Sequence, residues 1–198
     1  EGWMEAQGQP SEGFFWDDTQ ALFDAMTAMQ DAGRAVVVIG DTGALVDAAE
    51  AWRSADRPPL KEGVHIAVTG GMKGRREEWV SERVREAIQE GFGCRTVAGE
   101  YGMTELLSQA WSLKDGLYQT PPWMRMRLRR TDDALSVNAS GSTGGVDLID
   151  LANLSSCAFL STQDLARPST NESIDLQYFE LLGRFDRSEV RGCNLLVD

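Results

Sequence analysis

The stretch Gly99–Gln109, GEYGMTELLSQ, holds an aromatic side chain, a hydroxyl and a carboxylate within five residues. These are Tyr101, Thr104 and Glu105, directly after a short apolar run. A carboxylate can hold Mg²⁺ and a hydroxyl can bind a phosphate oxygen, as the chemistry of nucleotide phosphates requires. We expect a helix to begin at Thr104 and Glu105, where free amide groups favour an anion. Taken singly, Tyr101 is better explained as a packed core aromatic, and Glu105 as an acid at a helix N-terminus.

A parallel sheet is predicted to position this stretch. Continuous or short apolar runs begin near residues 35, 64 and 94. Each run is preceded by a helical pattern, over residues 19–33, 44–53 and 75–89. The spacing of about 30 residues is that of βαβ units. The run Ala35–Ile39 predicts a strand that is buried on both faces. Ligands bind beyond the carboxyl ends of such strands, where three turns converge: Gly40–Gly43, Thr69–Lys73 and Gly99–Glu105.

The character of the chain changes after Pro121 and Pro122. Apolar and basic residues alternate over residues 124–129, which predicts a two-faced strand, and short runs follow at Val146–Leu151, Cys157–Ser161 and Leu176–Leu182. The predicted fold is α/β, a parallel βαβ layer with helices on both faces followed by a small antiparallel or barrel-like β subdomain. The expected segments are 1–18 (irregular), 19–120 (α/β nucleotide-binding layer) and 121–198 (mainly β). The segment Ser140–Gly145, SGSTGG, is interpreted as a hairpin turn, because no helix follows it to bind a phosphate.

Composition limits the classes of function. The net charge is −12, which makes general nucleic-acid binding a poor expectation, and no apolar run is long enough to span a membrane. Residues 67–130 are the exception, with 11 basic and 8 acidic side chains. This balance suits a small anionic ligand, although a solvated helix face is the better explanation for most of these charges. Three widely spaced cysteines and a single histidine predict neither disulfides nor a zinc site, and favour a cytoplasmic location.

Several segments resemble those of adenylate-forming enzymes. Tyr101–Glu105 (YGMTE) resembles the YGxTE motif, Ser161–Leu165 (STQDL) resembles TGDL with Gln163 in place of glycine, and Gly183–Asp186 (GRFD) resembles GRxD. From Val64 onward the chain is most similar to acyl-protein synthetases of the LuxE type, in five segments: Thr69–Arg76 (TGGMKGRR), Tyr101–Trp111 (YGMTELLSQAW), Pro121–Met124 (PPWM), Ile149–Leu154 (IDLANL) and the ending Gly183–Leu196.

The resemblance implies ATP and Mg²⁺ as cofactors. Tyr101 would lie against the adenine, Thr104 would bind a phosphate and Glu105 would hold Mg²⁺. Asp164 would accept hydrogen bonds from the ribose hydroxyls, with Arg184 nearby. The remaining nucleotide contacts would come from the glycine-bearing turns and the motif itself: Gly70, Gly71, Gly102 and Met103.

The resemblance also implies a second step on a cysteine. A fatty acid would first form acyl-AMP, and Cys193 would then accept the acyl group as a thioester and pass it to an acyl reductase partner. Arg191 would favour the thiolate, which is the reactive form. Cys94 and Cys157 are expected to be small buried side chains instead.

The superfamily's Ser/Thr/Gly-rich phosphate loop has no convincing copy in residues 1–98. The chain is therefore expected to be the C-terminal portion of a longer enzyme and to be inactive alone. Two alternatives stay open: an AMP-forming ligase that transfers to coenzyme A, of the phenylacetate-CoA ligase type, and a non-catalytic fragment that docks a partner. The acyl chain length and the formation of a homo-oligomer are left undetermined.

Overall fold

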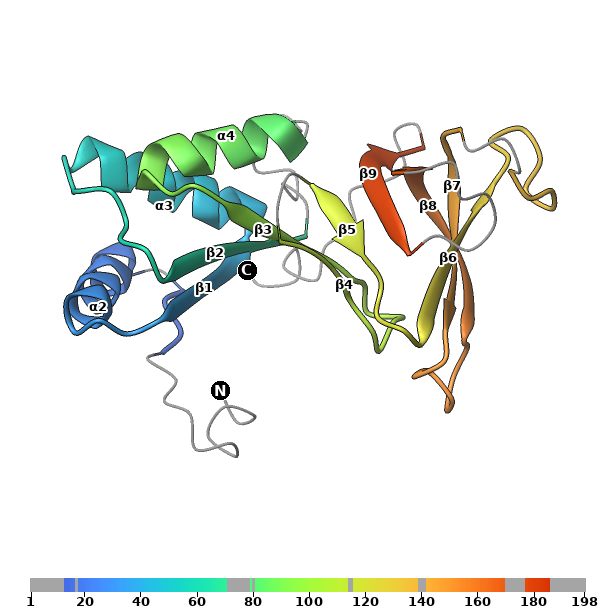
Figure 1. Cartoon of the computed structure of the whole chain (residues 1–198), viewed down its shortest axis with the longest axis horizontal. Coiled ribbons are helices and arrows are strands. Elements are labelled where there is room, and N and C mark those ends of the chain that lie inside the picture. The colour runs from blue at the N-terminus through green and yellow to red at the C-terminus, as the bar shows by residue number, and fades with distance from the viewer. Residues whose placement is uncertain are drawn as a thin grey trace.

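The structure is a computed structural model that describes residues 13–16, 18–70, 79, 81–113, 116–138, 142–169 and 177–185. The helices are α2 (Thr19–Asp31), α3 (Thr42–Ser54) and α4 (Ser81–Phe92). The strands are β1 (Val36–Asp41), β2 (Val64–Thr69), β3 (Val97–Tyr101), β4 (Ala110–Ser112), β5 (Leu117–Gln119), β6 (Met124–Arg129), β7 (Gly144–Asp150), β8 (Phe159–Pro168) and β9 (Tyr178–Arg184). They form one sheet in the order β1-β2-β3-β4-β5-β9-β8-β7-β6 (Figure 1).

The first half of the sheet is the predicted parallel layer. β1 pairs in parallel with β2, and β2 with β3, so the three carboxyl ends lie at one edge. Helices α2 and α3 begin where an aspartate accepts a backbone N–H: Asp18 from Ala21 at 2.8 Å and Asp41 from Ala44 at 2.9 Å. Such caps satisfy amide groups that a helix leaves unpaired at its start. The βαβ interpretation is confirmed.

Strand β1 is buried on one face only, so the prediction of burial on both faces is wrong. Val36 and Val38 are buried, whereas Val37 is 62% and Ile39 60% exposed. The large buried apolar side chains of α2, α3 and α4 belong to the same hydrophobic core as Val36 and Val38. Side chains alternate between the faces of a strand, so the described helices leave the face with Val37 and Ile39 uncovered.

Helices α3 and α4 pack closely above the sheet (Figure 1). Trp52 of α3 is fully buried and contacts Phe23 and Phe92 edge-to-face, with ring centroids 5.0 and 5.9 Å away. Gly91 of α4 lies against the backbone of Ala49, and a Cβ at Gly91 would be 2.6 Å from the Ala49 carbonyl. The absence of a side chain at Gly91 therefore sets the distance between the two helices.

The second half of the sheet is antiparallel, as predicted, but it continues the first half. β6, β7, β8 and β9 pair in sequence, and β9 joins the first half through β5 and β4. This half has its own hydrophobic core, which includes Met124, Met126, Leu148 and Phe179. β3 connects the two cores, since Val97 at its start belongs to the first and Tyr101 at its end to the second.

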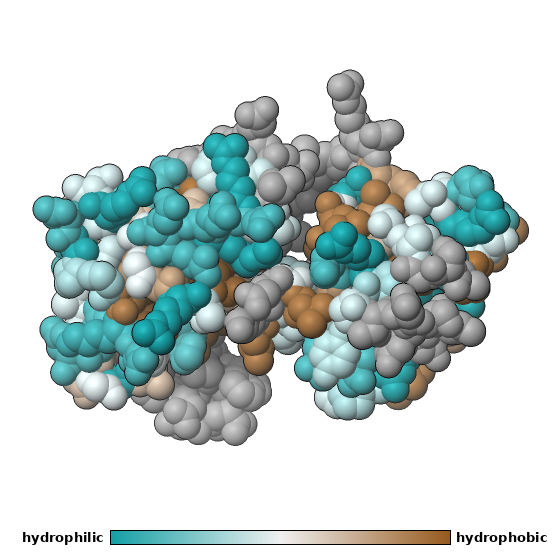
Figure 2. All heavy atoms as spheres, turned by 45° about the horizontal axis from the view of Figure 1, so that its top comes forward, coloured by the Kyte–Doolittle hydropathy of each residue, from teal (hydrophilic) through white to brown (hydrophobic). Residues whose placement is uncertain are grey.

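The surface differs between the two halves. Figure 2 shows hydrophilic side chains over the helical half and hydrophobic ones gathered where the halves meet. Among the described residues, no helix is long and apolar enough to cross a membrane.

Candidate functional site

The end of β3 and the middle of β8 meet through a hydrogen bond between side chains. The Tyr101 hydroxyl donates to the Asp164 carboxylate at 2.8 Å. Arg184 of β9 lies opposite Asp164 in the strand pairing, and its Nε is 3.6 Å from the same carboxylate. The structure thus brings Tyr101, Asp164 and Arg184 together, although 63 residues separate the first two in sequence.

Tyr101 is held in an aromatic cluster. Its ring meets Phe179 edge-to-face at 5.7 Å and Tyr118 at 6.3 Å, and only 6% of the residue is exposed. Burial, together with the neighbouring Asp164 carboxylate, raises the pKa of the Tyr101 hydroxyl well above its usual range. The hydroxyl therefore stays protonated and acts as a fixed donor to Asp164.

The strand that carries Asp164 is held by Arg129. This arginine is 9% exposed and donates to the Val146 carbonyl and the Asp147 carboxylate, both at 2.9 Å, and to the Thr162 carbonyl. Thr162 in turn accepts the Asp164 N–H through its hydroxyl at 3.1 Å. The arginine and the threonine fix the backbone on the N-terminal side of Asp164.

The motif that follows β3 forms a turn and not a helix, so the predicted helix at Thr104 and Glu105 is wrong. The Leu106 N–H donates to the Met103 carbonyl at 3.0 Å, and the chain then returns as β4, antiparallel to β3. Thr104 and Glu105 are both exposed on this turn, and Gly102 and Met103 are half-buried beside it. Ala110 pairs with Tyr101 in the sheet, so the residues after the turn form strand β4 instead of a helix.

Asp150, at the end of β7, supplies an anchor for this turn. Its Oδ2 accepts the backbone N–H groups of Leu107 at 3.0 Å and Ser108 at 2.9 Å, and its Oδ1 accepts the Ser108 hydroxyl at 2.6 Å and the Ala152 N–H at 3.1 Å. Burial alone would raise the pKa of this fully buried carboxyl. The hydrogen bonds outweigh burial and lower it below its usual value.

Asn153 contacts the same turn from the loop after β7. Its side-chain amide donates to the Glu105 carbonyl at 2.7 Å and to the Cys157 carbonyl at 3.0 Å. Its side-chain oxygen accepts the Ser156 hydroxyl. No role for Asp150, Asn153 or Arg129 is predicted from the sequence; the only signal is that IDLANL, which contains the first two, resembles a family segment.

The other two turns meet at the same edge of the sheet. The Thr42 hydroxyl donates to the Gly70 carbonyl at 2.6 Å, and the Thr69 hydroxyl to Glu100 at 2.7 Å. Gly70 has a φ of +68°, which favours glycine. The N-terminus of α3 is capped by Asp41 of this chain. Gly71 lies outside the described residues, as does Cys193.

The described cysteines differ from each other. Cys94 is half-buried, and burial raises the pKa of its thiol. Cys157 is exposed and donates to the Phe159 carbonyl at 3.0 Å, so the expectation that it is buried is wrong. Within the described ranges, no group of three or more His, Cys, Asp or Glu side chains is arranged to hold a metal.

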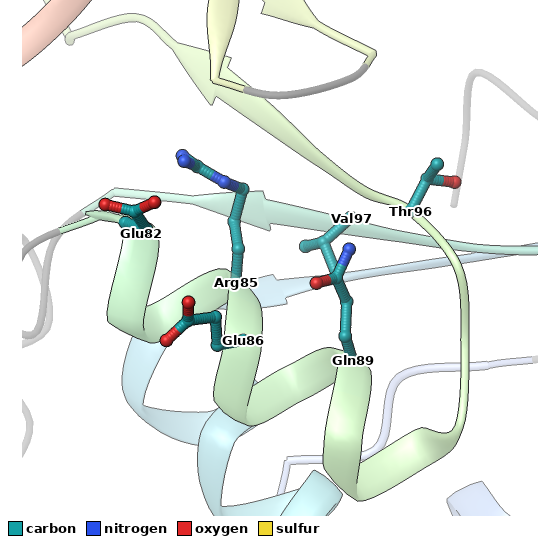
Figure 3. A pocket seen from close by; sticks show the side chains of 6 residues that line it. All are labelled: Glu82, Arg85, Glu86, Gln89, Thr96 and Val97. Atoms are coloured by element: carbon teal, nitrogen blue, oxygen red, sulfur yellow. The ribbon is translucent and has the colours of Figure 1, made fainter.

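A surface cavity of about 250 Å³ lies away from these residues (Figure 3). Its walls come from α4 and the start of β3: Glu82, Arg85, Glu86, Gln89, Thr96 and Val97. It contains none of the predicted site residues. The cavity is open and carries charges of both signs, so we place the candidate site at Tyr101, Asp164 and the turn after β3.

No protein-family model and no curated protein sequence matches the chain. Solved structures do match it. A 2-hydroxyisobutyryl-CoA ligase in complex with 2-HIB-AMP and CoA superposes with a TM-score of 0.63 at 16% identity, over 90% of this chain and 38% of that one. ATP-bound MatB from Rhodopseudomonas palustris gives 0.56 at 14% identity, over 84% and 33%.

The anthranilate CoA ligase AuaEII in complex with anthranoyl-AMP gives a TM-score of 0.55 at 14% identity, over 86% of this chain and 33% of that one. The chain thus spans less than two fifths of the length of each of these three proteins. The likeness shows the fold: a mixed α/β structure on one large sheet, as found in part of each of these three proteins. The predicted α/β class, with a parallel layer followed by antiparallel strands, is confirmed, whereas the described helices share one core on a single face of β1 and not on both faces as predicted.

Proposed function

We propose that this chain is part of an ATP-dependent ligase that activates a carboxylic acid as its acyl-AMP. The observation that carries the proposal is the hydrogen bond between Tyr101 and Asp164. It joins the two segments, YGMTE and STQDL, that resemble the nucleotide-binding motifs of adenylate-forming enzymes. The shared fold with ligases crystallised with ATP or an acyl-AMP supports the same activity.

In the proposed reaction an oxygen of the acid attacks the α-phosphorus of ATP. A P–O bond forms to the acid, the bond to the β-phosphate breaks, and pyrophosphate leaves with the electron pair. Asp164 would accept hydrogen bonds from the ribose hydroxyls. Arg184, which is exposed beside Asp164, would contact the ribose or the phosphate.

The turn after β3 fits a role at the phosphates. Glu105 is exposed, while its carbonyl is held by Asn153, so the carboxylate can reach a ligand from a fixed backbone. Mg²⁺ usually binds one or two protein carboxylates together with substrate phosphates and water. Glu105 would therefore hold Mg²⁺, which would neutralise phosphate charge, and Thr104 would hydrogen-bond a phosphate oxygen.

ATP–pyrophosphate exchange tests this proposal in the complete polypeptide. Asp164→Asn should raise the KM for ATP about tenfold or more, since a hydrogen bond to a charged group contributes about 1.5–3 kcal/mol. Asp132→Asn is the matched control, because Asp132 is an exposed aspartate outside the motif segments that pairs with Arg130. Absence of acid-dependent exchange in the wild type would contradict the proposal.

We propose further that the substrate is a long-chain fatty acid and that Cys193 is the acyl acceptor. The support is the resemblance to acyl-protein synthetases, which extends through Arg191-Gly192-Cys193 near the end of the chain. The thiolate would attack the acyl carbonyl, a C–S bond would form, AMP would leave, and the thiol proton would pass to solvent. An acyl reductase would then receive the acyl group from the thioester.

Transfer to coenzyme A is the second candidate. The structural neighbours favour it, since they are CoA ligases and one is in complex with CoA. Adding CoA to enzyme, ATP and fatty acid separates the two candidates. Catalytic accumulation of a soluble acyl-CoA would support the CoA ligase, whereas acyl transfer that stops at one equivalent per protein would support Cys193.

A further inference from the structure

We propose that Asp150 and Asn153 are positioning residues that hold the turn with Thr104 and Glu105 in place for the nucleotide phosphates. The inference rests on the function proposed above. It follows from the way this turn is held, which differs from the helix that the sequence predicts.

The turn is closed by the hydrogen bond from the Leu106 N–H to the Met103 carbonyl. Thr104 and Glu105 are exposed, and no helix follows to fix their backbone by a ladder of hydrogen bonds. Fixing the backbone of an exposed residue costs conformational entropy. An exposed turn that must present a carboxylate at a defined place therefore needs support from outside.

Asp150 gives that support from β7. The residue is fully buried, and its own N–H donates to the Ala158 carbonyl at 2.8 Å. The backbone that carries the carboxylate is therefore fixed. Its Oδ2 binds two consecutive amide groups, those of Leu107 and Ser108. Hydrogen bonds to a charged acceptor are roughly twice as strong as neutral ones. The C-terminal side of the turn is thus attached to the sheet.

Asn153 holds the other side. Its amide nitrogen donates to the carbonyl of Glu105 itself, at 2.7 Å. The Asn153 N–H donates to the Asp150 carbonyl at 3.1 Å, so the two supporting residues are joined to each other. Together they fix the backbone from Glu105 to Ser108, which determines where the Glu105 side chain begins. Neither Asp150 nor Asn153 needs to contact the nucleotide.

The first test measures the support directly. Amide hydrogen exchange at Leu107 and Ser108 should be slow in the complete wild-type polypeptide and at least about tenfold faster in Asn153→Ala and Asp150→Asn. Val146→Ala is the control, since Val146 is a fully buried residue of the same strand, β7, and it truncates the core without removing these hydrogen bonds. Equal exchange in wild type and Asn153→Ala, or equal acceleration in Val146→Ala, would overturn the inference.

The second test measures the role in the reaction. Asn153→Ala should raise the KM for Mg·ATP in pyrophosphate exchange about tenfold, as expected for residues that orient a metal ligand, and leave the KM for the acid unchanged. A parallel change in both KM values, or the same change in Val146→Ala, would overturn the positioning role. If the wild type shows no exchange at all, the proposed function fails, and the support by Asp150 and Asn153 is judged by amide exchange alone.

Discussion

The Tyr101 hydroxyl lies 2.8 Å from the Asp164 carboxylate and donates a hydrogen bond to it. The bond connects the last residue of β3 with a residue in the middle of β8, across the boundary between the parallel and antiparallel parts of the sheet. It therefore serves both the stability of the molecule and the geometry of the candidate site.

Tyr101→Phe should destabilise the protein by about 1.5–3 kcal/mol, because the Asp164 carboxylate loses its buried phenol donor while the ring stays in place. Urea denaturation monitored by circular dichroism measures the change. Tyr118→Phe is the matched control, because it removes a hydroxyl from a ring of the same cluster that stacks on Phe179. Equal losses of unfolding free energy in the two variants would show that the hydrogen bond to Asp164 stabilises the protein no more than the Tyr118 hydroxyl does.

Asp150→Asn should reduce the stability at pH 7 by about 2–3 kcal/mol, since a neutral amide replaces the ionised acceptor of several hydrogen bonds. The pKa of Asp150 is lowered on folding, so its contribution is complete above the unfolded value of about 3.9 and is lost as the pH falls further. Urea midpoints measured from pH 7 down to acid should therefore converge for wild type and variant. A constant difference across this range would contradict the assignment.

Because β1 is buried on one face only, substitutions of its two neighbouring valines should differ in their effect on stability. Val38→Ala removes buried methyl groups and should cost about 2 kcal/mol, whereas Val37→Ala should stay within about 0.5 kcal/mol. The two substitutions are chemically identical and lie next to each other, so each controls for the other. Equal losses in thermal or urea denaturation would mean that another part of the protein covers Val37.

Gly91→Ala should destabilise the packing of α4 on α3. The added Cβ would lie 2.6 Å from the Ala49 carbonyl, and overpacking of this kind costs about 1–3 kcal/mol. This loss opposes a gain of about 1 kcal/mol in helix propensity. Glu86→Ala, at an exposed position of the same helix, should change stability little. An increase in the melting temperature of Gly91→Ala would contradict the close contact seen here.

The sequence predicted the parallel layer well because its signals are local. Apolar runs with a constant spacing and aspartates before helices need no knowledge of distant residues. The exposed face of β1 could not be predicted in this way, because Val37 and Ile39 are as apolar as their buried neighbours. Burial is decided by what covers a strand, and α2, α3 and α4 share one core.

The candidate site shows the same limit. The resemblance predicted that Tyr101 and Asp164 serve one nucleotide, and the structure joins the two by a hydrogen bond. The turn after β3 has the polar and apolar spacing of a helix, yet pairing of Tyr101 with Ala110 prevails. Asp150 accepts a hydrogen bond from Ser108, which lies 42 residues earlier in the sequence, and nothing near Asp150 in the sequence indicates this contact.

The most direct measurement of the proposed function is ATP-dependent labelling of the complete polypeptide with a radioactive fatty acid. We predict one hydroxylamine-sensitive label per protein, which Cys193→Ser abolishes while ATP–pyrophosphate exchange persists. Cys157→Ser, which replaces an exposed thiol on the described surface, should keep the label. Label that survives in Cys193→Ser, or a wild type that forms acyl-AMP without acquiring any label, would contradict the account.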